Sequence, residues 1–191
     1  DQESPSYALI GVRACELAAL AIQDKILMND HSPDPVYKAR RKKNFIVAVN
    51  CTKASPTCFC TSMHSGPKAV SGFDLVLTEV IGSSYHYFLA EAGTELGGEI
   101  LQEIPSSAAT EEQIRSADDL VAKAAGQIKR TLNTDDIRNL LLRNLEHRRW
   151  DEAASRCLSC ANCTMVCPTC FCTTVEEATD VTGRHAERWR K

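Results

Sequence analysis

The stretch FIVAVNC, residues 45–51, decides the fold of the first half of the chain. Its short apolar run is typical of a buried strand. A second such run, YALIGV at residues 7–12, is followed by CELAALAIQDKIL, which has helical spacing and Glu16 in its first turn. PVYKARRKK, just before residue 45, also has helical character. Two strands with helical connections between them predict an α/β layer with parallel strands.

A cysteine follows each of these two strands. Cys15 lies at the start of the first predicted helix, and Cys51 ends the second apolar run. Because ligands bind at the carboxyl edge of open α/β sheets, we expect Cys15 and Cys51 to be neighbours there. DLVLTEVI and YHYFLAEA, separated by Gly82 and two serines, are predicted to form a hairpin, so the sheet is predicted to be mixed.

The composition narrows the class of protein. The chain has 191 residues, a net charge of −3 and ten cysteines. This charge gives no electrostatic argument for nucleic acid or an anionic membrane, and no run approaches the roughly 18 apolar residues of a membrane helix. Without a secretory signal, we expect a cytoplasmic protein, in which so many cysteines indicate metal or redox chemistry. No G-x-G-x-x-G motif follows a strand, so a flavin or nicotinamide signature is lacking.

CLSCANCTMVCP, residues 157–168, carries the strongest metal-binding signal. Its spacing is the C-x2-C-x2-C-x3-C-P run of bacterial ferredoxins, which predicts a 4Fe-4S cluster. Structural zinc is the alternative, but zinc ribbons separate their C-x2-C pairs by a dozen or more residues. The predicted ligands are Cys157, Cys160, Cys163 and Cys167.

Three cysteines of this region keep open roles. In two-cluster ferredoxins the fourth cysteine of a run ligates the other cluster, whose own run is not found in these 191 residues. Cys167 therefore either closes the first cluster or belongs to a second one. Cys170 and Cys172, in the second of two PTCFCT segments, are additional ligands or packed neighbours.

The first PTCFCT segment, residues 56–61, predicts a second site. In an extended segment, Cys58 and Cys60 face the same side at about 6–7 Å. With Cys15 and Cys51 they make the four thiolates that a 4Fe-4S cluster requires. The alternative is that some are ordinary buried cysteines. The nearby His64 is a ligand or proton donor or, more commonly, an exposed loop histidine. The basic run KARRKK, residues 38–43, could dock an acidic partner, but such a run is more often a solvated helix face.

The region after Thr94 is predicted to be largely helical. Amphipathic stripes run through residues 111–132 and 134–145, with Thr134 as a credible helix start. The connecting segment IPSSAATEE, residues 104–112, marks the expected domain boundary. We predict an α/β domain with a cysteine-rich strand-end site at 1–105, and a helical segment with a ferredoxin-type, α-helical 4Fe-4S module at 106–191.

The segments GVRACELAAL, NCTKASPTCFCTSMHSGP and RCLSCANCTMVCPTCFC, with VTGRHAERWR, together resemble one family. They are similar to the iron-sulfur beta subunit of cytoplasmic sulfhydrogenases, NAD(P)-linked nickel-iron hydrogenases, and to the A subunit of anaerobic sulfite reductase. The resemblance implies an electron-transfer subunit between a flavin and NAD(P) subunit and a hydrogenase or sulfite reductase subunit. The family continues into a second cysteine run, so the resemblance also implies that this chain is a fragment without the distal cluster.

Three functions remain open at this point. The leading hypothesis is an electron relay that performs no bond chemistry on a substrate, so the chain is expected to be a non-catalytic subunit. The second is a zinc-stabilised interaction domain in which the cysteines are structural. The third is a thiol-based sulfur-handling enzyme in which Cys170 or Cys172 is nucleophilic.

Overall fold

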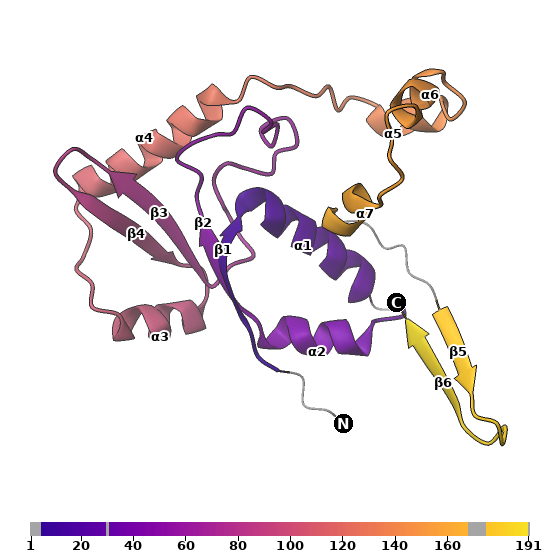
Figure 1. Ribbon diagram of the computed structural model, residues 1–191. Helices are drawn as coiled ribbons and strands as arrows, with labels where there is room; N and C mark the ends of the chain where they lie inside the picture. The colour runs from indigo at the N-terminus through magenta and orange to yellow at the C-terminus, as the bar shows by residue number, and fades with distance from the viewer. Residues whose placement is uncertain (1–4, 30, 168–174, 191) are drawn as a thin grey trace. The chain divides into compact units, whose positions relative to one another are not determined.

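The computed structural model describes residues 5–29, 31–167 and 175–190 and divides into two compact units. The first unit comprises residues 1–157 and contains a four-stranded sheet with helices; the second comprises residues 158–191 (Figure 1). The division after residue 105 stays a prediction, because contacts do not test which parts fold independently. The elements of the first unit are β1 Ala8–Arg13, α1 Ala14–Leu27, α2 Pro35–Lys43, β2 Phe45–Val49, β3 Leu75–Ile81, β4 His86–Ala92, α3 Glu95–Glu103, α4 Glu111–Gln127, α5 Ile137–Leu142 and α6 Arg149–Ala154.

The predicted mixed sheet is confirmed. Its strand order is β1-β2-β3-β4, with β1 and β3 both parallel to β2 and β4 antiparallel to β3. Gly11, at φ +88°, lies where the register between β1 and β2 shifts by one residue. Only glycine adopts this backbone conformation without strain. The bulge allows Leu9 and Val12 to pack against one core although they are three residues apart.

One core joins α1 to the sheet. Ile46 and Ala48 of β2 and Val76 of β3 are almost completely buried beside Ala14 and Leu17 of α1. Alternate residues of a strand face the same side of the sheet, so Ile46 and Ala48 of FIVAV both face the side that α1 covers. A second helix, α4, packs against β3 and β4 and buries its small apolar face, Ala117, Val121 and Ala124.

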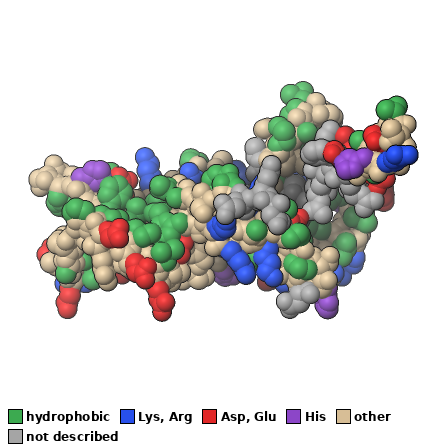
Figure 2. Space-filling view, turned by 90° about the horizontal axis from the view of Figure 1, so that it is seen from below, with side chains coloured by type: hydrophobic (Ala, Val, Ile, Leu, Met, Phe, Trp, Pro, Cys, Tyr) green, Lys and Arg blue, Asp and Glu red, His purple; other side chains and the backbone are tan. Residues whose placement is uncertain are grey.

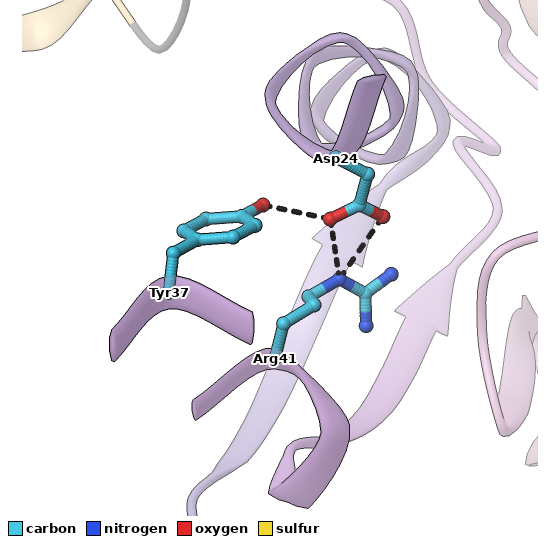
Figure 3. Close-up of polar contacts among 3 residues, drawn as sticks. All are labelled: Asp24, Tyr37 and Arg41. Atoms are coloured by element: carbon cyan, nitrogen blue, oxygen red, sulfur yellow. Dashed lines mark hydrogen bonds and ion pairs between the residues drawn. The ribbon is translucent and has the colours of Figure 1, made fainter. Parts of the chain in front are cut away.

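The link between α1 and α2 is polar. The Tyr37 hydroxyl donates to Asp24 Oδ1 at 2.7 Å, and Arg41 Nε lies 3.1 and 3.2 Å from the two carboxylate oxygens (Figure 3). Burial and the Asp24 carboxylate raise the pKa of the Tyr37 phenol well above its usual value. The phenol is thus held in its protonated, donating form.

The side chain of Asn50 joins β2, β3 and the loop that follows the cysteine segment. Its Nδ2 donates to Thr78 Oγ1 at 2.9 Å, and its Oδ1 accepts the backbone N–H of Ala69 at 2.8 Å. Asn50 is 3% exposed and Thr78 is 2% exposed. These bonds are made in the absence of competing water, so losing one partner leaves the other buried and unsatisfied.

The second helical stripe is shorter than predicted. Helix α5 covers only residues 137–142, and Leu140, Leu141 and Leu145 are exposed. Residue Asp136, and not Thr134, precedes the helix, in the left-handed conformation at φ +52°. A helix of six residues has few internal hydrogen bonds and no buried face, so its apolar stripe stabilises it little.

The second unit contains strands that the sequence did not predict. Helix α7 spans Asn162–Val166, and β5 Val175–Thr179 pairs antiparallel with β6 Ala186–Arg190. The connecting turn is shaped by Asp180, whose Oδ1 accepts the N–H of Arg184 at 3.1 Å, and by Gly183 at φ +68°. The expectation of a wholly α-helical module is therefore wrong for residues 175–190, because this local turn folds the chain back on itself.

Replacing Asn50 tests its role in the fold. We expect Asn50→Ala to lower the free energy of unfolding by about 1–3 kcal/mol, because the Thr78 hydroxyl and the Ala69 N–H lose their buried partner. Denaturant unfolding measures the difference. The control is the half-buried Asn144, whose side chain donates to Leu140 O; Asn144→Ala should change stability by less than about 0.5 kcal/mol. Equal losses in the two variants would contradict the assigned role.

The raised pKa of Tyr37 predicts a pH dependence of stability. In the unfolded chain tyrosine ionises near pH 10, whereas folded Tyr37 keeps its proton to higher pH. Its contribution is therefore full below about pH 10 and declines as the pH rises from there towards the folded pKa. Urea unfolding of wild type and Tyr37→Phe between about pH 8 and 11 should show a difference that shrinks with pH. A constant difference would be inconsistent with this ionisation.

Candidate functional site: the cysteine edge of the sheet

The carboxyl ends of β1 and β2 bring the first cysteine set together. Cys15 lies in the first turn of α1 directly after β1, and Cys51 follows β2 after Asn50. The chain then makes the turns of residues 56–64 that carry Cys58 and Cys60. All four cysteines are free thiols; Cys15 is exposed and the other three are half-buried.

The pKa shifts of two of these thiols fit their placement at one edge of the sheet. Burial raises the pKa of the Cys51 thiol; the Arg13 guanidinium lowers it, and the thiols of Cys15, Cys60 and Cys58 raise it. The pKa of Cys60 is also raised, first by burial and then by Cys15 and Cys58, while two backbone N–H groups oppose the shift. Bringing thiolates together in a partly dry site is unfavourable unless a positive group compensates their charge.

Cys60 is placed by the loop at residues 60–67. Its carbonyl accepts the backbone N–H groups of Met63 at 3.1 Å and Ser65 at 3.0 Å, which closes a tight turn. Gly66, at φ +153°, then passes so near that a Cβ there would lie 3.2 Å from Ala14 Cβ and 3.4 Å from Cys60 Sγ. The next residue, Pro67, accepts the N–H of Cys51 at 3.2 Å. This loop therefore fixes Cys60 beside the start of α1 and beside Cys51.

Helix α4 and the segment after it contact the same loop through three polar interactions between residues far apart in the sequence. Lys68 Nζ lies 2.6 Å from Asp118 Oδ1, an ion pair that raises the pKa of Lys68. The N–H of Ala54 donates to Gln127 Oε1 at 3.3 Å, and the N–H of Leu132 donates to Ser62 Oγ at 3.1 Å. We call these three interactions the α4 brace. Each is exposed and modest in energy, but together they span the loop on both sides of the thiols.

The donor set has the chemistry of an iron-sulfur cluster site. Sulfur alone is offered, and four thiolates are the usual ligands of a 4Fe-4S cluster. Among the residues that the structure describes, no three cysteine, histidine, aspartate or glutamate side chains converge enough to hold one metal ion. The chain's residues therefore supply the ligand chemistry of a cluster, and the assignment of individual ligands stays a prediction.

The second cysteine set lies on an open loop. Cys157, Cys160 and Cys163 are exposed and Cys167 is half-buried at the end of α7. Ser159 and Ala161 adopt left-handed conformations, at φ +51° and +58°, which wind the chain tightly between the cysteines. Such small residues tolerate this winding at moderate cost. Cys170 and Cys172 lie outside the described residues.

Sequence reasoning missed the residues that support the first site. Asn50, Gly66 and the α4 brace were not predicted. A polar residue that interrupts the apolar run just before Cys51 is a signal that identifies Asn50 as special, because buried amides require partners. The brace had no local signal, since its pairs are 50 to 73 residues apart in sequence. His64 is exposed, at φ +50°, and no ligand role is evident for it.

Comparison with known proteins agrees with the cysteine pattern. Residues 156–191 match the model of the 4Fe-4S dicluster domain family. The chain is 34% identical over 168 residues to the protein named sulfhydrogenase 2 subunit beta of Pyrococcus furiosus. The resemblance to the iron-sulfur beta subunits of sulfhydrogenases is confirmed. The predicted 4Fe-4S cofactor is confirmed with it.

The extent of this similarity is uneven. The aligned region covers 87% of this chain but 48% of the relative, so the chain spans about half the length of the sulfhydrogenase subunit. No solved structure matches the chain. In the described part of the chain, none of the helices has the length and apolar character that crossing a membrane requires.

Gly66 provides a test of how the loop positions Cys60. Gly66→Ala should lower the free energy of unfolding by about 1–3 kcal/mol, because φ +153° is strained for alanine and its Cβ would crowd Ala14. The matched variant Gly98→Ala, in α3, places its Cβ 4.0 Å from Ala92 Cβ, an ordinary contact. It should be neutral or stabilising by up to about 1 kcal/mol. Thermal unfolding of both variants measures these changes. A Gly66→Ala protein as stable as wild type would refute the close packing at Gly66.

Proposed function

We propose that this chain is an electron-transfer subunit that holds 4Fe-4S clusters through two sets of cysteine thiolates. The observation that carries the proposal is the placement of Cys15, Cys51, Cys58 and Cys60 at the carboxyl edge of the sheet, where the loop at residues 60–67 holds Cys60 beside α1 and Cys51. When bound, 4Fe-4S clusters accept and donate single electrons, at potentials that burial and hydrogen bonds to sulfur adjust. The chain's own residues bind the clusters, exclude water and orient backbone N–H groups towards the sulfurs.

The two sets are proposed to serve one cluster each. Cys157, Cys160 and Cys163 hold the cluster of the C-terminal, ferredoxin-type module, with Cys167 in the fourth position. Cys170 and Cys172 are kept as accessory candidates beside it. The match of residues 156–191 to the dicluster family supports the second site. The half-buried position of three of the four N-terminal thiols supports the first, because burial protects an oxygen-sensitive group.

The relay is proposed to work between other subunits. The relative is named as a subunit of a sulfhydrogenase, which supports partners of the hydrogenase type. A flavin and NAD(P) subunit on one side and a hydrogenase or sulfite reductase subunit on the other fit a chain that lacks a flavin or nicotinamide motif of its own. A reducing cytoplasm, under anaerobic conditions, is the compartment that keeps these thiols available as ligands.

Iron counting tests the two sites separately. After anaerobic reconstitution we expect about eight irons and eight acid-labile sulfides per chain. Cys58→Ala and Cys160→Ala should each lower the count to about four, and the double variant to about zero. The serine-to-alanine change Ser55→Ala, on the same loop, is the control and should leave the count unchanged. About four irons in both wild type and Cys58→Ala would eliminate the N-terminal site.

The same preparation separates the relay from the alternatives. A zinc-stabilised domain would be colourless and would contain stoichiometric zinc in place of iron. A sulfur-handling thiol enzyme would form a persulfide on Cys170 or Cys172, and the double variant would lose it. Brown protein whose absorbance near 400 nm bleaches on reduction, with no persulfide, is the result expected for the relay.

A further inference from the structure

The basic helix α2 is the feature that the proposed relay does not use. From Pro35 to Phe73 the sequence contains no aspartate or glutamate, although the whole chain has a net charge of −3. Positive charge is thus concentrated in the segment that forms α2 and the cysteine loop, and the rest of the chain is acidic. The basic residues of this segment are Lys38, Arg40, Arg41, Lys42, Lys43, Lys53 and Lys68.

Packing explains only part of this charge. Arg41 is committed to Asp24, and Lys68 to Asp118. Lys38, Arg40 and Lys42 are exposed, and within the described residues no ion pair involves them. Cations in the last turn of a helix interact favourably with its dipole, which accounts for Arg40 and Lys42 but not for Lys38. Figure 2 shows the Lys and Arg side chains gathered over α2, which lies at the bottom of Figure 1.

A surface groove connects this basic helix with the thiol site. Its volume is about 480 Å³. It is lined by Arg41 of α2, by apolar residues of α1 together with Asp24, and by residues of the loop between Thr61 and Gly72. Gly66 forms part of the lining and lies against Cys60 Sγ. The groove therefore leads from α2 to the residue that places one of the predicted cluster ligands.

We propose that α2 and this groove are the docking surface for an acidic one-electron carrier protein, which exchanges electrons with the N-terminal cluster. The inference rests on the proposed function, since it assumes a cluster at Cys15, Cys51, Cys58 and Cys60. Electron transfer weakens steeply with distance, so a carrier must dock beside the cluster it serves. Redox encounters use small interfaces and are steered by complementary charge, which the exposed Lys38, Arg40 and Lys42 supply.

Charge reversal on α2 tests the docking surface in the full chain. The variant Lys38→Glu/Arg40→Glu/Lys42→Glu spares Arg41 and every cysteine. The control, Arg115→Glu/Lys123→Glu/Lys129→Glu, makes the same charge change on and just beyond α4. Each reconstituted protein is mixed in a stopped-flow instrument with a reduced, strongly acidic ferredoxin, or with dithionite, whose small size makes α2 unnecessary.

The expected result is that only the α2 variant loses the electrostatic acceleration of its reaction with ferredoxin. At about 20 mM salt, the α2 variant should be reduced by ferredoxin at least about tenfold more slowly than wild type, and the control variant less than about threefold. The wild-type rate should fall about tenfold towards 300 mM salt, whereas the α2 variant should lose this dependence. Dithionite is itself an anion, so it should reduce the two charge-reversed variants, which carry the same net charge, at equal rates.

Other outcomes overturn the inference. The iron content and the reduction by dithionite show whether the clusters are intact. If they are, an equal salt dependence of the ferredoxin reaction in wild type and the α2 variant would exclude α2 as the docking surface. Tight binding of a 20-nucleotide DNA that the α2 variant loses, without any ferredoxin effect, would assign the basic face to nucleic acid instead. The absence of iron in the wild type would refute the proposed function itself. If charge reversal prevents folding, the glutamine variant at the same three positions replaces it.

Discussion

The cysteine edge of the sheet depends on one buried amide. Asn50 lies between Val49, the last residue of β2, and Cys51. Its two side-chain bonds connect β2, β3 and the loop that returns after the cysteines. Its backbone N–H also donates to Leu77 O at 2.9 Å. Because a buried amide has few alternative partners, it fixes the direction in which the chain leaves the sheet. The position of Cys51 follows directly from this direction.

The other thiols are positioned by segments that contact Asn50 or the end of β2. The loop after Cys60 returns to Ala69, the second partner of Asn50, and in returning it places Gly66 against α1 and Cys60. Helix α1 in turn is oriented by its packing on Ile46 and Ala48 and by the polar contact of Asp24 with α2. Thiols from three separate segments thus share one small region because each segment is tied to the end of β2.

Local patterns in the sequence were sufficient for the sheet and for the cluster motifs. The apolar runs at residues 7–12 and 45–51 predicted parallel strands, and alternation with a short polar turn predicted the β3–β4 hairpin, because each signal lies within one element. Residues 134–145 show the limit of such reasoning, since an apolar stripe forms a stable helix only where a partner surface buries it. The hairpin of β5 and β6 depends on the side chain of Asp180, which closes its turn. No apolar run in the sequence indicated these two strands.

The support of the site was beyond local reasoning for a different reason. The α4 brace joins residues 50 to 73 positions apart through single polar contacts, each of which resembles an ordinary surface residue in the sequence. This separation has a consequence for biosynthesis. A growing chain that ends before Glu111 already contains all four N-terminal thiols, on a loop that nothing yet holds from the α4 side. Chains fold from the N-terminus as they emerge, so the nascent protein passes through a stage in which this loop lacks its three contacts with α4 and the segment after it.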